Sequence, residues 1–132
     1  MLTALRSSVV DRLTALAAGD LDVWATIPDD VAALPCLVAG LPSATPADQN
    51  GVVFDRTLVV YVIGRRVDAG GNETELTDLA DRLFDGFGGT RGVRLDDGSH
   101  VAVDSVVPRV VAVAGVDHDA YLLTLTSQIA TC

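Results

Sequence analysis

The sequence predicts one α+β domain over residues 1–132, an antiparallel or mixed β-sheet with an N-terminal helix and a second helix packed on one face. Apolar residues recur at helical spacing over 2–16 and again over 72–87. Strand-like apolar runs follow each helical segment, at 52–64 and in the last third of the chain. This order of helix, strands, helix and strands favours an antiparallel sheet covered by helices on one face.

The first third of the chain predicts a helix and two short strands. An apolar stripe at intervals of three or four residues consists of Leu2, Leu5, Val9, Leu13 and Leu16. Gly19 is a natural C-cap for this helix. A strand is expected over Leu21–Ile27, ended by the turn Pro28–Asp30. Ala33–Leu41 is a second extended segment, which Pro35 restricts to a sheet edge or a strand start.

The middle of the chain predicts a loop, the strongest strand and the second helix. Gly40–Gly51 is rich in Gly and Pro and is expected to be a loop. Val52–Gly64 follows as a strand whose β-branched centre should be covered on both faces. After the connection Arg65–Asn72, Asn72 and Glu75 form a capping box that starts a helix. The glycines that should stop this helix are Gly86, Gly88 and Gly89.

The last third of the chain predicts β-structure. A short strand over Val93–Leu95 leads into the turn Asp96–Gly98. His100–Gly115 is extended, and its Pro108 indicates an edge strand or a bulge. Ala120–Ala130 alternates between apolar and polar residues, which is typical of a strand that is buried on one face.

Composition excludes several classes of function. The chain has a net charge of −9, which argues against a protein that grips nucleic acid or an anionic membrane. It is 49% hydrophobic, yet no apolar run approaches the length of a membrane span, so part of the apolar surface should face partners. Cys36 and Cys132 fit no metal spacing, and the N-terminus does not resemble a signal peptide. Reduced thiols in the cytosol are expected.

Asp117-His118-Asp119 is the segment that most resembles a chemical site. Two carboxylates beside an imidazole could belong to a metal or hydrolytic centre, but the only other histidine is His100. The tripeptide lies between two strand-like runs, so we interpret it as a hairpin tip. His100 and the nearby aspartates are interpreted as a solvated strand face. A small metal-dependent enzyme that uses His100 and His118 stays the alternative of another class.

A few further residues are candidates for contacts with other proteins. Trp24 is the only tryptophan and is expected to anchor the core or an interface. Arg65 and Arg66 form a basic pair in an acidic chain and could form ion pairs across a subunit interface. Asp117, His118 and Asp119 join them as a polar contact loop. No catalytic, cofactor-binding or metal-binding residue is predicted.

Four segments in order resemble the tail terminator (tail completion) proteins of long-tailed bacteriophages. They are Val23–Pro42 with its turn and Pro-Cys strand, Leu58–Arg65, the helix Leu76–Phe87, and Arg109–Ala130 with its Ala-Tyr-Leu-Leu-Thr-Leu-Thr strand. The resemblance covers nearly the whole chain and is a pattern of elements without a catalytic motif.

The resemblance implies a structural virion protein in the neck region of the tail, assembled in the host cytoplasm. Such subunits form a hexameric ring that caps the tail tube, ends polymerisation of the tube protein and joins the head-side connector. DNA passes through the lumen without specific binding, and no enzyme activity, cofactor or membrane is implied. A neck or head-completion protein on the portal side is the alternative.

Overall fold

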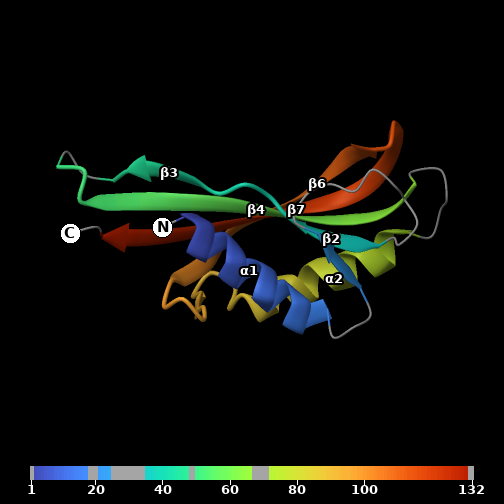
Figure 1. Cartoon of the computed structure of the whole chain (residues 1–132). Coiled ribbons are helices and arrows are strands. Elements are labelled where there is room, and N and C mark those ends of the chain that lie inside the picture. The colour runs from blue at the N-terminus through green and yellow to red at the C-terminus, as the bar shows by residue number, and fades with distance from the viewer. Residues whose placement is uncertain (1, 18–20, 25–34, 48–49, 67–71, 131–132) are drawn as a thin grey trace.

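The computed structural model describes residues 2–17, 21–24, 35–47, 50–66 and 72–130 (Figure 1). The expected C-cap Gly19 and the expected turn Pro28–Asp30 lie outside these ranges. Within them, neither helix is long and apolar enough to cross a membrane.

Two helices and a curled sheet make up the described chain. In order, the elements are α1 (Leu2–Ala17), β1 (Asp22–Trp24), β2 (Cys36–Ala39), β3 (Ser43–Pro46), β4 (Val53–Arg66), α2 (Asn72–Gly86), β5 (Val93–Arg94), β6 (His100–Val113) and β7 (Val116–Ala130). The strand order is β1-β2-β4-β7-β6-β5, and β3 also pairs with β4. All pairs are antiparallel except β1 with β2. The predicted α+β fold with a mainly antiparallel sheet is confirmed.

The central pair of strands, β4 and β7, separates the two faces of the sheet. Paired residues share a face, and alternate pairs direct apolar side chains toward the helices. The buried side chains on this face include Leu58, Val60, Val62, Leu123 and Leu125. Burying one such side chain stabilises the fold by roughly 1.5–3 kcal/mol. The alternation predicted for Ala120–Ala130 is therefore confirmed.

Both helices pack on this face, as Figure 1 shows. The predicted stripe of α1 is largely correct, since Leu5, Val9 and Leu13 are buried. Arg12 of α1 donates two hydrogen bonds, of 3.0 and 2.7 Å, to the carbonyl oxygen of Gly86 at the end of α2. A cation suits the negative end of a helix, so this contact both caps α2 and joins the two helices.

The N-terminal half of α2 lies close to β4 because β4 contributes a glycine there. A Cβ placed on Gly64 would lie 2.8 Å from the side chain of Leu76.

The predicted stop of α2 is confirmed, because the helix ends at Gly86 and the amide of Gly89 donates back to the carbonyl oxygen of Phe84. The amide of Gly88 also donates to the carbonyl oxygen of Asp85, and the two bonds form a Schellman ending in which Gly88 has φ +76°.

The expectation that Gly40–Gly51 is a loop was wrong in part. Ser43–Pro46 forms β3, which pairs antiparallel with β4 from Ser43 opposite Thr57 to Pro46 opposite Phe54. Its side chains are mostly exposed, and a proline is compatible with a strand at the edge of a sheet. The segment is a strand because β4 extends beyond β2 and presents backbone groups that β3 can bond.

The hairpin tip is Ala114–Gly115, so its predicted location at Asp117–Asp119 was wrong. Val113 pairs with Val116, and the two residues between them have φ of 52° and 79°. Two consecutive positive φ values are the signature of a type I′ turn, which matches the twist of the flanking strands. The tripeptide begins after this turn and belongs to β7.

The sheet curls where the hairpin extends past the helices. In Figure 1 the β6–β7 hairpin bends away from the helices at this end. A second buried cluster joins Cys36 of β2, Ile63 of β4, Ala120 of β7 and Val113 of β6. These four strands are neighbours in the sheet. The cluster lies on the face opposite the helices, and the curl of the sheet covers that face at this end.

We predict that Ala114→Asn stabilises the protein by about 0.5–1 kcal/mol. Ala114 has a positive φ that is unfavourable for alanine, whereas asparagine adopts this conformation readily and Asn-Gly is the preferred type I′ pair. Chemical unfolding of the variant and the parent measures the difference. Ala112→Asn is the control, because Ala112 is an exposed residue within β6. Equal or lower stability of Ala114→Asn would contradict the turn assignment.

Candidate functional site

The face of the sheet opposite the helices is uncharged at its centre. We call open face the nine residues of three cross-strand rows: Thr57–Thr126–Ala102, Val59–Thr124–Ser105 and Tyr61–Leu122–Val107. All nine are half-buried. In a chain with a net charge of −9, an extended surface of hydroxyl and aliphatic groups is typical of a contact surface.

The Asp117-His118-Asp119 tripeptide does not form a joint site. Because it lies in β7, its side chains alternate between the two faces of the sheet. Asp117 is exposed and Asp119 is half-buried, whereas His118 points to the opposite face and is 1% exposed. The two carboxylates therefore do not flank the imidazole. The predicted contact role of Asp117 and Asp119 stays a prediction.

His118 is held by the backbone of the neighbouring strand. Its Nδ1 lies 3.0 Å from the carbonyl oxygen of Gly64, and since a carbonyl only accepts, Nδ1 carries the hydrogen. Nε2 is buried without a hydrogen-bond partner among the described residues. The contact lies where the pairing of β4 with β7 shifts register between Ile63 and Arg66. His118 therefore bonds to the backbone of β4 where the regular pairing of β4 with β7 is interrupted.

Three predicted contact residues are placed by their backbone alone. Trp24 ends β1, and Arg65 and Arg66 end β4, where Arg66 pairs with His118. Their side chains lie outside what the structure describes. The contact roles of Trp24, Arg65 and Arg66 stay predictions.

The two histidines of the metal hypothesis lie far apart. His100 begins β6, whereas His118 is paired with Val111 near the other end of that strand. Among the residues that the structure describes, no group of three or more His, Cys, Asp or Glu side chains could hold a metal ion. The structure therefore does not bring His100 and His118 together in one site.

A buried arginine is the most unusual polar residue of the core. Arg56 is 1% exposed and lies on the helix face of β4, directly opposite Ser127 of β7. Its guanidinium donates hydrogen bonds of 2.9 Å to the hydroxyl oxygens of Ser99 and Ser127. Ser99 in turn donates its backbone amide and its hydroxyl to the carboxylate of Asp97, at 2.9 and 2.7 Å.

Charges in this cluster support one another. Burial lowers the pKa of Arg56 below its ordinary value, and the negative charge of Asp97 opposes that effect. For Asp97, desolvation alone would raise the pKa. The hydrogen bonds from Ser99, the charge of Arg56 and a hydrogen bond from Ser8 of α1 outweigh it, so the pKa of Asp97 is lowered. The cluster thus joins α1, the β5–β6 turn, β4 and β7.

Sequence reasoning did not identify Arg56, although a signal was present. Every second position of one strand faces the same side of the sheet, and such a series contains Arg56, Leu58, Val60 and Val62. The arginine is therefore expected on the same buried face as the three apolar residues. An arginine on such a face needs several hydrogen-bond partners. Its partners come from the β5–β6 turn and β7, and no sequence spacing connects these segments.

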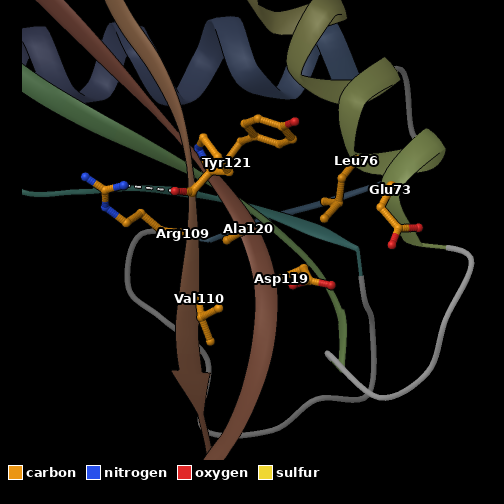
Figure 2. A pocket seen from close by; sticks show the side chains of 8 residues that line it. Glu73, Leu76, Arg109, Val110, Asp119, Ala120 and Tyr121 are labelled. Carbon is orange, nitrogen blue, oxygen red and sulfur yellow. Dashed lines mark hydrogen bonds between the residues drawn. The ribbon is translucent and has the colours of Figure 1, made fainter.

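A hollow of about 310 Å³ lies between the first turns of α2 and the β6–β7 hairpin (Figure 2). Its lining includes Glu73, Leu76, Pro108, Val110, Asp119 and Tyr121. We call it the hairpin hollow. Its walls are largely apolar, and two carboxylates lie on one side.

We predict that Arg56→Met lowers the free energy of unfolding by about 1–3 kcal/mol. The change removes the guanidinium that donates to the hydroxyl oxygens of Ser99 and Ser127. It also removes the positive charge that stabilises the carboxylate of Asp97. Chemical unfolding followed by circular dichroism measures the loss. Arg82→Met is the matched control, since Arg82 is exposed on α2 and should change stability by less than about 0.5 kcal/mol. Equal effects of the two variants would contradict a structural role for Arg56.

We predict that Asp97→Asn destabilises the protein at neutral pH and has little effect in acid. The folded-state pKa of Asp97 lies below its unfolded value of about 3.9. The stabilisation is therefore complete above the unfolded pKa and is lost as the pH falls through the folded pKa. Unfolding free energies of parent and variant between neutral pH and pH about 3 measure this. A difference that does not shrink toward acid pH would contradict it.

The sequence matches no protein-family model, and no curated protein matches it significantly. The features available for an inference of function are therefore those of the chain itself. They are the uncharged open face, the hairpin hollow and a core that is fixed by the Arg56 cluster.

Proposed function

We propose that this chain is a structural virion subunit that assembles into a ring, caps the tail tube of a long-tailed phage and ends its polymerisation. The observation that carries the proposal is the open face. A sheet covered by helices on one side only, with nine uncharged residues at the centre of its other side, suits a protein that acts by packing against other proteins.

The chemistry of the open face supports the proposal further. Its rows contain Thr, Ser, Val, Leu, Ala and one Tyr, which can pack closely against a neighbouring sheet or tube surface without an uncompensated charge. Two acidic residues border these rows. Asp55 is exposed and pairs with Gln128, and Asp104 is exposed in the bulge of β6 between Val103 and Ser105. A net charge of −9 also suits a ring through which DNA passes without binding to its wall.

The likeness to tail terminators rests on the order and lengths of the elements. The long strand β4 continues toward a helix, α2, and the chain ends in the strand that carries Ala120–Thr126. These are the segments in which the sequence resembles that family. The proposal therefore combines a resemblance over nearly the whole chain with a surface whose composition suits assembly.

We predict that the protein limits the length of growing tail tubes. Purified tube protein from the same virus is polymerised with and without this chain, and tube lengths and end caps are measured by electron microscopy. Short tubes with a cap at one end are expected. Unchanged tube length together with bare tube ends would overturn the proposal, and binding to connector rings instead would move the chain to the portal side.

A variant of the open face sharpens this experiment. Thr124→Arg places a charge in the middle row and should weaken assembly or capping by about tenfold or more. Thr14→Arg is the matched control, since Thr14 is exposed on α1, away from the open face. Both variants should unfold at nearly the parental denaturant concentration. Equal capping by the two variants would contradict a role for the open face.

A further inference from the structure

One leucine stands out from the surface beside α1. Leu41 is 80% exposed, the largest value among the exposed large apolar side chains that the structure describes. It lies between β2 and β3, where the amide of Gly40 donates a 2.8 Å hydrogen bond to the carbonyl oxygen of Val59. A Cβ on Gly40 would lie 2.8 Å from that oxygen, so the glycine holds the chain against β4 while Leu41 points outward.

Leu41 belongs to a larger apolar surface. Leu2, Val10 and Pro42 lie beside it along a shallow groove at the start of α1. Arg6 lines the same groove and donates a 3.3 Å hydrogen bond to the carbonyl oxygen of Ala39, which holds a positive charge near Leu41. We call Leu41 with these neighbours the Leu41 knob. Within it, Leu41 projects from the edge of the groove, and Arg6 places a cation in the groove.

The hairpin hollow has the opposite character. Val110 is 58% exposed at its edge, and Leu76, Pro108 and Tyr121 provide apolar walls. Figure 2 shows Glu73 and Asp119 together on one side of the hollow. Arg109 also lines the hollow, but its guanidinium donates to the carbonyl oxygen of Pro108 and points away from both carboxylates (Figure 2).

The knob and the hollow lie at different ends of the molecule. In Figure 1, α1 and α2 begin at opposite ends of the helical layer. The knob contains the first turns of α1, and the hollow contains the first turn of α2. One copy can therefore use its knob toward one neighbour and its hollow toward another.

We propose that Leu41 of one copy inserts into the hairpin hollow of a second copy, with Arg6 on the side of Glu73. The apolar side chain of Leu41 fits the apolar walls, and the positive charge of Arg6 is opposite in sign to that of the exposed Glu73. Such a contact joins two different surfaces, so it continues in one direction and closes into a ring when the rotation between copies allows it. The inference rests on the proposed function and identifies the contact between subunits.

Two single variants and a control test the contact. Leu41→Asp removes the apolar side chain of the knob and introduces a negative charge that Glu73 of the neighbouring copy would repel. Val110→Asp places a negative charge at the edge of the hollow. Val52→Asp is the matched control, since Val52 is 40% exposed and lines neither surface. Light scattering after size exclusion, from micromolar to millimolar protein, measures the mass. Each test variant should weaken self-association by about 10- to 100-fold, and the control should assemble like the parent.

A mixture of the two variants tests the direction of the contact. The Leu41→Asp chain keeps an intact hollow, and the Val110→Asp chain keeps an intact knob. Mixed in equal amounts, they should form a 1:1 heterodimer and nothing larger, because only one productive contact can be made. A mixture that stays monomeric while each variant alone is folded would overturn the pairing of knob with hollow.

Further outcomes separate the inference from the proposed function. If both variants assemble as the parent does, the knob and hollow are not the contact, and the proposed ring stands with another interface. If the parent is monomeric over the whole range, the inference is overturned, and the tube-length experiment then decides the proposed function separately. If the parent assembles through Leu41 but leaves tube growth unchanged, the contact holds and the proposed function fails.

Discussion

The antiparallel pairing of β4 with β7 is the constraint on which the rest of the structure depends. Because paired residues share a face, this register directs Leu58, Val60 and Leu123 toward the helices and Val59 and Thr124 toward the open face. A slip of one residue would exchange the two faces and bury hydroxyls under α1. The same register places Arg56 opposite Ser127 and His118 near Gly64. Core, open face and buried polar groups thus follow from one set of backbone hydrogen bonds.

Most of the fold could be predicted from the sequence because periodicity records burial directly. The stripe of α1 and the alternation of Ala120–Ala130 each reflect a side that is buried, and both were confirmed. β3 was missed because Ser43–Pro46 has the composition of a loop, and its strand conformation comes from pairing with β4. The hairpin tip was misplaced because Asp117–Asp119 is more polar than Ala114–Gly115, although the glycine at 115 was the stronger turn signal.

The candidate surfaces were less predictable, since they join segments that are distant in the sequence. The hairpin hollow needs α2 and the far end of the β6–β7 hairpin, and the knob needs α1 beside the β2–β3 connection. Composition indicated only that apolar surface should remain for partners. Arg56 carried a clear signal in its alternation with Leu58, but its partners became visible only once the β5–β6 turn was placed beneath α1. The predicted contacts of Trp24, Arg65 and Arg66 remain predictions.

Gly64 acts as the spacer that sets the distance between helix and sheet at the hollow. It lies beneath Leu76, whose side chain lines the hollow, and leaves no room there for even one more carbon. A larger residue at this position would displace the side chain of Leu76 and so change the wall of the hollow. The shape of a surface cavity therefore depends on a buried residue behind its wall. A substitution at position 64 would reshape the hollow while every residue that lines it keeps its identity.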